Sequence, residues 1–447
     1  MEKADVIVIG SGQGGVPLAV NLAREGKQAI LFERRSLGGS CLNYGCYPSK
    51  AFLAAAHDAG VRRRAAGFGV DMRTEVNFQR LMEHVRSKID SSYIKKALAK
   101  AGVRTIMAEA SFTGERTVAG GGQEFHADTV VINTGNGPWL PPIPGLDNTP
   151  YLTYINFWEI NKLPPRILII GGGYIGVELG QGLAELGAQV HIIEKSDRIV
   201  AGEEPDLSEV LTKALAGSGV VFHLGRQAKQ VSHDGNVFKL TLDNDEILEG
   251  EALLVVAGQQ ANTAALDCAA SGVELTERGF VKVGDRLESS CPGVYAIGDV
   301  TGQPAFTHVS WEDFRRLMSI LKGGGRRQMD RVLGYAFYTE PEAGRCGLTV
   351  EQARKQGLNA RAVTLPLKRV ARAWLSDRTN GFYRLVVENG SDRILGATLV
   401  GPRASDLVHV VIDLMEAGAT WRDLEKSVHI HPAFAEGLPT LARLLQS

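Results

Sequence analysis

The sequence lacks both an excess of charge of one sign and any long hydrophobic run. Its 447 residues include 49 Lys or Arg and 50 Asp or Glu, so the formal net charge is −1 at pH 7. A net charge so close to zero implies no polyelectrolyte partner, and we expect no nucleic acid partner. No apolar stretch approaches the roughly 18 residues of a membrane-spanning helix, and no signal peptide precedes the first predicted strand at residues 5–10. We therefore expect no membrane association and a cytoplasmic location.

Cysteine is scarce. The chain has five cysteines, an odd number, and only Cys41 and Cys46 lie close together in the sequence. In a reducing compartment, such an isolated pair is more often catalytic than structural. Cys268, Cys291 and Cys346 have no spacing typical of metal ligands, so we predict no metal site and interpret these three as small buried residues.

The rest of the composition is ordinary. Hydrophobic residues make up 44% and charged residues 22% of the chain, which excludes a disordered or fibrous protein. The length predicts about three domains with substantial cores.

The two neighbouring cysteines lie in residues 38–50, GGSCLNYGCYPSK. In an ideal α-helix, Cα atoms five residues apart are roughly 8.7 Å apart, whereas a disulfide needs about 4.4–6.8 Å. Cys41 and Cys46 can therefore bond only if the helix is distorted. Gly45 supplies backbone freedom and Pro48 removes an amide donor, so the sequence contains what such a distortion needs. The alternative is two unrelated buried cysteines, which the flanking glycines and the Pro-Ser-Lys sequence make less favourable.

Residues 5–33 fit a dinucleotide-binding βαβ unit. A short apolar strand precedes the pattern G-x-G-x-x-G, formed by Gly10, Gly12 and Gly15, and an amphipathic helix follows it. Glu33 ends the next strand, 18 residues after the last glycine (33 − 15). The glycines let a pyrophosphate approach the helix N-terminus, and the carboxylate accepts hydrogen bonds from ribose hydroxyls. The unit therefore predicts a bound nucleotide.

Residues 166–194 repeat this arrangement. Gly171, Gly173 and Gly176 follow a strand and open a helix, and Glu194 lies 18 residues after the last glycine (194 − 176). Two fingerprints predict two dinucleotides, and we assign FAD to the first and a nicotinamide cofactor to the second, because hydride passes from a diffusible carrier to a bound one. The Glu194 carboxylate would repel a 2′-phosphate, so NADH is favoured over NADPH.

Together these segments resemble the class I pyridine nucleotide-disulfide oxidoreductases, flavoproteins that include dihydrolipoamide dehydrogenase, glutathione reductase and mercuric reductase. The resemblance implies that Cys41 is the interchange thiol that attacks substrate and that Cys46 is the charge-transfer thiol against the flavin. It also places Lys50, one turn after Cys46, near the flavin N5 and in an ion pair with Glu178. Tyr174 resembles the tyrosine that covers the nicotinamide pocket.

Two further segments resemble flavin-contacting motifs of that family. Thr134 and Gly135 follow an apolar strand, although Asn133 stands where alanine is commoner. Gly298 and Asp299 resemble the second FAD motif, in which the aspartate binds hydroxyl groups of the cofactor through charge-assisted hydrogen bonds.

The C-terminal segment contains His431, Pro432 and Glu436, which resemble the family's H-P-x-x-x-E element. There the histidine and glutamate form an acid–base dyad that reaches the disulfide of the other subunit, which implies a homodimer. The chemistry requires such a base because the thiolate is the nucleophile and protons must be taken up and released near neutral pH. Glu436 would fix the imidazole tautomer. His308, near the expected flavin, fits a structural or a functional role equally well.

The predicted fold class is α/β, with two Rossmann-like dinucleotide-binding domains and a C-terminal α+β interface domain for dimerisation. We expect the FAD-binding domain at residues 1–154 and 276–330, the NAD(P)-binding domain at residues 155–275 and the interface domain at residues 334–447.

The predicted function is an FAD-dependent oxidoreductase. Electrons would pass from NAD(P)H through FAD and the Cys41–Cys46 disulfide to a disulfide, a metal ion or an oxidised sulfur compound, as in a branch that is mercuric-reductase-like or dihydrolipoamide-dehydrogenase-like. Two alternatives stay open: a dihydrolipoamide dehydrogenase, with a lipoyl-bearing protein as a partner, and a flavin NADH oxidase or electron-transfer protein that needs no disulfide. Tyr44 and Tyr47 flank Cys46 where aliphatic residues are usual, which makes lipoamide turnover less favoured.

Overall fold

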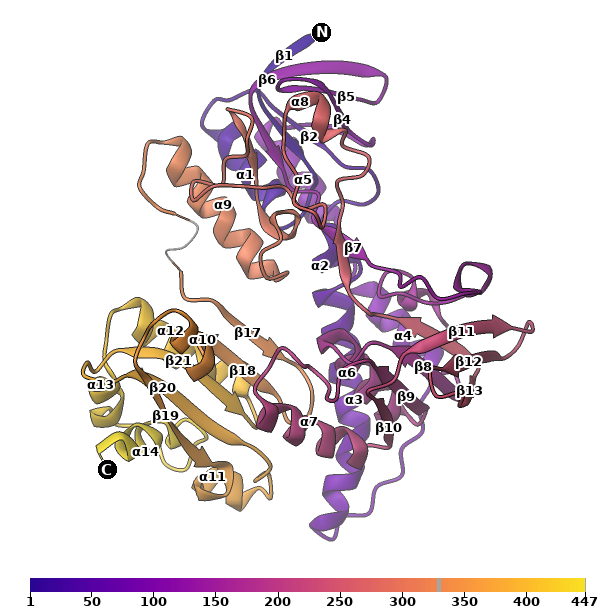
Figure 1. Ribbon diagram of the computed structural model, residues 1–447, viewed down its shortest axis with the longest axis vertical. Coiled ribbons are helices and arrows are strands. Elements are labelled where there is room, and N and C mark those ends of the chain that lie inside the picture. The colour runs from indigo at the N-terminus through magenta and orange to yellow at the C-terminus, as the bar shows by residue number, and fades with distance from the viewer. Residues whose placement is uncertain (328–330, 447) are drawn as a thin grey trace.

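A computed structural model describes residues 1–327 and 331–446 (Figure 1). Residues 328–330, at the end of the predicted FAD-binding domain, and Ser447, at the end of the predicted interface domain, lie outside the described residues. Among the described residues, no helix is both long enough and apolar enough to cross a membrane.

The N-terminal part of the chain forms a mixed sheet with the order β3-β2-β1-β6-β5-β4, in which β16 pairs with β6. Strand β1 pairs in parallel with β2 and β6. Residues 6–9 of β1, 29–32 of β2 and 130–132 of β6 are apolar and buried, as expected for a sheet covered on both faces. The strands are β1 (Glu2–Ile9), β2 (Ala29–Phe32), β3 (Arg104–Ile106), β4 (Ser111–Gly114), β5 (Thr117–Gly120), β6 (Gln123–Ile132) and β16 (Val294–Ala296). The helices of this part are α1 (Gly15–Arg24), α2 (Gly39–Asn43), α3 (Cys46–Gly67), α4 (Phe78–Ser87), α5 (Ser92–Ala101), α8 (Cys268–Ser271) and α9 (Thr307–Leu321), with a 3-10 turn η3 (Gly298–Thr301).

The second part repeats the parallel arrangement, with the order β10-β9-β8-β14 and a small antiparallel sheet β11-β12-β13 beside it. The strands are β8 (Arg166–Ile170), β9 (Gln189–Glu194), β10 (Val220–Leu224), β11 (Ala228–His233), β12 (Phe238–Leu242), β13 (Ile247–Gly250) and β14 (Ala252–Val255). Its helices are α6 (Tyr174–Leu186) and α7 (Pro205–Gly217). The strands β8 and β9 flank the second fingerprint, as the sequence predicts.

A two-stranded ribbon of β7 (Asn136–Pro138) and β15 (Gln259–Ala261) connects the two parts. After β15, the side chains of Leu266, Cys268 and Val273 are buried in the same apolar cluster as strands of the first sheet. The chain has thus returned to the first sheet before residue 276, where we expected the return.

The C-terminal part is an antiparallel sheet with the order β17-β18-β21-β20-β19, flanked by helices. The strands β17 and β18 come first along the chain, and β19, β20 and β21 follow them. The strands are β17 (Gly334–Phe337), β18 (Ala343–Gly347), β19 (Ala360–Pro366), β20 (Phe382–Glu388) and β21 (Ile394–Val400). The helices are α10 (Val350–Lys355), α11 (Ala371–Leu375), α12 (Ala404–Glu416), α13 (Trp421–Lys426) and α14 (Gly437–Arg443), with the 3-10 turn η4 (Leu367–Arg369).

Helix α3 joins the first two parts because it packs along α6 (Figure 1). A Cβ atom on Gly182 of α6 would lie only 2.7 Å from the Phe52 ring of α3, so the small residue allows the helices to approach closely. This packing brings the residues that follow Cys46 next to the start of α6.

Candidate active site

The helix that contains the two cysteines is broken, as the sequence predicts. Helix α2 ends at Asn43 and α3 begins at Cys46, and between them Gly45 has φ −111° and ψ −110°. The N–H groups of Tyr44 and Gly45 both donate to the Ser40 carbonyl, and the Trp158 indole N–H donates to the Tyr44 carbonyl at 2.9 Å. These bonds satisfy the backbone groups that the break exposes.

The two thiols of the pair interact directly. Cys41 and Cys46 are free cysteines, both half-buried. A hydrogen bond from the Cys41 thiol lowers the pKa of Cys46 to about 6; the Thr307 hydroxyl, 3.0 Å from Cys46 Sγ, and the Lys50 ammonium act in the same direction, and burial opposes them. The same bond, followed by burial, raises the pKa of Cys41. At neutral pH the reduced pair therefore holds its negative charge on Cys46.

An ion pair lies beside this thiolate. Lys50 Nζ donates to Glu178 Oε2 at 2.8 Å, and the buried Glu178 carboxylate also accepts the Tyr338 N–H at 2.9 Å. The Lys50 ammonium lies 4.3 Å from the centroid of the Tyr338 ring. The Lys50–Glu178 pair is thus present, and Tyr338, which the sequence did not indicate, completes it.

Replacing Lys50 with Gln should raise the pH at which the thiol pair first ionises. Removal of the cation should shift this pH from about 6 upward by about one pH unit, since a nearby positive charge favours the thiolate. The rate of alkylation by iodoacetamide between pH 4 and 9 measures this midpoint. Lys355→Gln removes an exposed lysine of α10 and serves as the control; equal midpoints in all three proteins would contradict the assignment.

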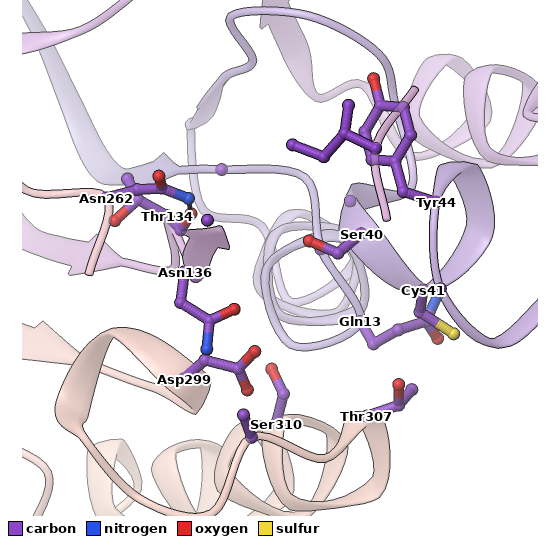
Figure 2. A pocket seen from close by; sticks show the side chains of 18 of the residues that line it. Gln13, Ser40, Cys41, Tyr44, Thr134, Asn136, Asn262, Asp299, Thr307 and Ser310 are labelled. Atoms are coloured by element: carbon purple, nitrogen blue, oxygen red, sulfur yellow. Dashed lines mark hydrogen bonds between the residues drawn. The ribbon is translucent and has the colours of Figure 1, made fainter. Parts of the chain in front are cut away.

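The cysteines line a cavity of about 630 Å³ that extends to the first fingerprint (Figure 2). Figure 2 shows Asp299 and Thr307 on one side and Ser40 and Cys41 on another. Eleven predicted site residues line the cavity: Gly10, Gly12, Glu33, Cys41, Cys46, Lys50, Thr134, Gly135, Tyr174, Glu178 and Asp299.

This cavity fits the flavin nucleotide that the sequence predicts there. Thr134 Oγ1 is buried without a hydrogen-bond partner, which is costly unless a ligand supplies one. The Asp299 carboxylate accepts no hydrogen bond from another described side chain, and burial, followed by the charges of Cys46 and Asp313, raises its pKa to about 6. Both groups face a space in which ribityl or ribose hydroxyls could satisfy them.

The glycines of the first fingerprint are sterically required. Gly10 has φ +105°, and a Cβ atom on Gly15 would lie 2.1 Å from the Gly10 carbonyl oxygen. Glu33 Oε2 accepts hydrogen bonds from Ser11 N–H at 3.1 Å and Ser11 Oγ at 2.6 Å, so the carboxylate also fixes the loop. Gly15 itself lies beneath the cavity rather than on its wall.

Asn133 joins three segments around this loop. Its Oδ1 accepts the Gly15 N–H at 2.8 Å, and its Nδ2 donates to the Ile297 carbonyl at 3.0 Å and to Ser310 Oγ at 3.3 Å. Alanine, commoner here in the family, could make none of these bonds. Gly298 lies at the same junction, where its N–H donates to the buried Asp313 carboxylate at 2.9 Å, and it does not line the cavity.

The second fingerprint has the same geometry but lies outside the cavity. A Cβ atom on Gly176 would lie 2.0 Å from the Gly171 carbonyl oxygen, and Gly173 caps α6. Glu194 Oε2 accepts the Gly172 N–H at 2.7 Å. Tyr174 connects the second fingerprint with the cavity. Its ring lines the cavity, and the centroid of the ring lies 6.2 Å from that of Phe306.

The predicted dyad is formed but stands apart from the thiols of its own protomer. His431 Nδ1 lies 2.7 Å from Glu436 Oε2, and the His431 side chain is 73% exposed. Neither residue lines the cavity. The His431 imidazole, which Glu436 orients, is therefore accessible to a site on another molecule.

Other residues of the site were not predicted from the sequence. Thr307 contacts Cys46 from 261 residues away, and Asn262 Nδ2 donates to the Thr134 carbonyl at 2.9 Å. No local pattern marks either residue. His308 Nε2 lies 2.6 Å from the Gly334 carbonyl oxygen, a contact that ties α9 to β17 and favours the structural role. Among the described residues, no group of three or more His, Cys, Asp or Glu could hold a metal ion.

Two dinucleotide-binding units, one of them opening into a cavity with a thiol pair, define a flavin-dependent, pyridine-nucleotide-linked oxidoreductase. A family model described as "Pyridine nucleotide-disulphide oxidoreductase" matches residues 4–313, and its dimerisation domain matches residues 334–442. The chain therefore belongs to the pyridine nucleotide-disulphide oxidoreductase family and is a flavoprotein disulfide reductase that uses FAD and NAD(P)H. The predicted family and fold class are confirmed, and the dimerisation domain supports a homodimer.

Relatives of the chain carry different names. It is 31% identical over 458 residues to the "Probable pyridine nucleotide-disulfide oxidoreductase RclA" of Escherichia coli K12, with 100% of both chains covered. It is 31% identical to a mercuric reductase of Bacillus cereus, over 97% of this chain and 70% of the relative. It is 32% identical to a dihydrolipoyl dehydrogenase of Thermus scotoductus, over 100% and 98%. The solved Cu(II) complex of the HOCl-induced flavoprotein disulfide reductase RclA from Escherichia coli has a TM-score of 0.90 and 29% identity, covering 100% of both chains.

Proposed function

We propose that the chain reduces a disulfide, an oxidised sulfur compound or a metal ion with electrons from NADH, through Cys41 and Cys46. The observation that carries this proposal is the thiol pair itself: the two sulfurs interact at a break between helices and line the nucleotide cavity. Cys41 would attack a sulfur substrate or bind a metal ion. Cys46 would remain ionised as a thiolate beside Thr307 and Lys50. The protein would be an oxidoreductase that acts on a sulfur group or a metal ion. Its location would be the cytoplasm.

The nucleotide-facing residues have supporting roles in this proposal. Gly10, Gly12, Glu33, Thr134 and Asp299 would hold FAD, with Gly15, Gly135 and Gly298 shaping the backbone around it. When bound, FAD accepts two electrons from NAD(P)H and passes them to the sulfur pair. Lys50, held by Glu178, stabilises negative charge at the inner end of the cavity.

We propose NADH as the preferred donor because of Glu194, with Gly171, Gly173, Tyr174 and Gly176 forming the rest of its site. The Glu194 carboxylate favours two free ribose hydroxyls and repels a 2′-phosphate.

Replacing Glu194 with Gln should therefore weaken the preference for NADH. The amide keeps an acceptor for the Gly172 N–H but removes the charge, so the ratio of kcat/KM for NADH to that for NADPH should fall by at least about tenfold. Glu209→Gln, an exposed carboxylate of α7, is the control and should leave the ratio unchanged. A ratio that stays the same in Glu194→Gln would contradict the role of Glu194.

The dyad of His431 and Glu436 is proposed to work across the dimer. It would take a proton from an incoming thiol, or give one to a leaving thiolate, at the Cys41 of the other protomer. Glu436 would hold the Nδ1–H of His431, which leaves Nε2 free for this transfer.

The second candidate is dithiol oxidation with NAD and a lipoyl-bearing protein partner, which the similarity to a dihydrolipoyl dehydrogenase favours. NADH consumption with lipoamide, oxidised glutathione, 5,5′-dithiobis(2-nitrobenzoate) and Hg(II) distinguishes the candidates. We expect turnover with at least one of these acceptors and its loss after alkylation of the reduced protein. Turnover only with artificial one-electron acceptors, unaffected by alkylation, would instead identify a disulfide-independent NADH oxidase.

A further inference from the structure

A short segment of the C-terminal part carries an excess of positive charge. Lys368, Arg369 and Arg372 lie on η4 and the start of α11, all three are exposed, and none forms an ion pair with a described residue. We call these three residues the basic rim. The rim lies on a chain whose net charge is −1 and in which other surface cations, such as Arg104, Lys229 and Lys282, are paired.

The segment that follows the rim holds one carboxylate, the exposed Asp377, which forms no ion pair with the rim. Arg378, the next cation along the chain, is paired with Glu340. The side chains that follow the rim, Trp374 and Leu375, are 67% and 55% exposed and carry no charge. The surface therefore combines unpaired cations with apolar area, which favours an anionic organic ligand over an inorganic ion.

The rim is fixed next to the dyad. Val370, between Arg369 and Arg372, is buried, and a Cβ atom on Gly437 would lie 2.8 Å from Val370 Cγ2. Gly437 directly follows Glu436, the carboxylate of the dyad. The rim and α14 also share one apolar cluster, which includes Leu367, Val370, Ala373, Leu438 and Leu441. The segment that carries the rim therefore packs directly beside the segment that carries the dyad.

We infer that the basic rim binds the anionic group of the substrate in the active site of the partner protomer. This inference rests on the proposed function, in which the dyad of one protomer serves the Cys41 thiol of the other. The substrate is then a disulfide or oxidised thiol that bears a carboxylate. Guanidinium groups bind carboxylates with two parallel hydrogen bonds, and the cleft between two protomers strengthens such contacts by excluding water.

Pairs of disulfides that differ in charge test this inference. Lipoate and 5,5′-dithiobis(2-nitrobenzoate) carry carboxylates, whereas lipoamide and 4,4′-dithiodipyridine are neutral. The variant Lys368→Gln/Arg369→Gln should raise KM for the anionic substrates by about tenfold and leave KM for the neutral ones within about twofold, because only the former lose a charge contact. The value of kcat should stay within about twofold for both groups, because the rim binds substrate without touching the reacting sulfurs. Arg372→Gln should show the same selectivity with a smaller effect.

The control is Arg354→Gln/Lys355→Gln, which removes two exposed cations of α10, a helix in a separate apolar cluster. Added salt should weaken wild-type turnover of the anionic substrates and have little effect in the rim variant. If the rim variant changed KM equally for anionic and neutral substrates, or changed it for neither, the inference would be overturned while the proposed function stands. A wild-type protein that reduces none of the four disulfides would overturn the inference, and one that also reduces neither oxidised glutathione nor Hg(II) would overturn the proposed function as well.

Discussion

Cys41→Ser should abolish disulfide reduction by the protein. The expected loss in kcat is at least about 10³-fold, because the serine hydroxyl cannot attack or release a sulfur through exchange. The fold should be retained, since Cys41 is half-buried in the short helix α2 and serine is smaller than cysteine. NADH consumption with each disulfide of the panel measures the effect.

The same variant distinguishes the electron transfer that precedes the thiols from the electron transfer through the thiols to the substrate. Reduction of ferricyanide by NADH needs no thiol, so Cys41→Ser should keep it within about twofold of the wild-type rate. Cys268→Ala, which removes a buried cysteine from the apolar cluster of the first sheet, is the control and should keep both activities. Full disulfide turnover in Cys41→Ser would show that electrons leave the protein by another route.

His431→Ala should lower turnover of dithiols and disulfides by about 10²- to 10⁴-fold, the usual contribution of a general acid–base. The imidazole is 73% exposed and bonded to Glu436, so its removal should cost little stability. Glu436→Gln should have a smaller effect in the same direction, because the amide can still orient the ring. Steady-state NADH consumption with each disulfide measures both effects.

Mixed dimers test whether the dyad acts across the interface. Cys41→Ser and His431→Ala are each nearly inactive alone, but a dimer with one copy of each has one site with both defects and one intact site. Random mixing should therefore restore about a quarter of wild-type activity, because half of the twofold-symmetric dimers are mixed. Activity that does not rise on mixing would place the dyad and the thiol in the same protomer.

Local features of the fold were predictable from the sequence. The strands β2 and β8 lie within the two predicted βαβ units because each is a short apolar run between turn residues, and a strand buried on both faces permits little else. The break between α2 and α3 followed from disulfide geometry, since no regular helix brings Cys41 and Cys46 together.

Long-range features were not predictable in the same way. Residues 262–275 have an apolar pattern that fits either sheet, and the ribbon of β7 and β15, whose register spans the two nucleotide units, decides which sheet they join. The hydrogen bonds of Asn133 and the contact of Thr307 with Cys46 likewise depend on tertiary packing. The side-chain types permit these contacts, but no local spacing requires them.

The residues of the active site likewise divide into those that the sequence predicts and those that depend on tertiary packing. The Lys50–Glu178 ion pair follows from a family resemblance at two motifs, whereas Tyr338, which completes it from the C-terminal part of the chain, lies in no motif. The dyad, with its action on a second protomer, was predicted from the resemblance of His431, Pro432 and Glu436 to the family's H-P-x-x-x-E element, and the exposure of His431 is a feature that only the structure supplies.

In the proposed mechanism, Cys41 and Cys46 form a disulfide bond that electrons from NADH reduce reversibly. The most direct measurement is mass spectrometry of the peptide that carries both residues, after rapid alkylation of the FAD-loaded protein with and without NADH under anaerobic conditions. The peptide should be unmodified and internally linked before NADH is added and doubly alkylated afterwards. A peptide that is doubly alkylated in both samples, or linked in both, would contradict it.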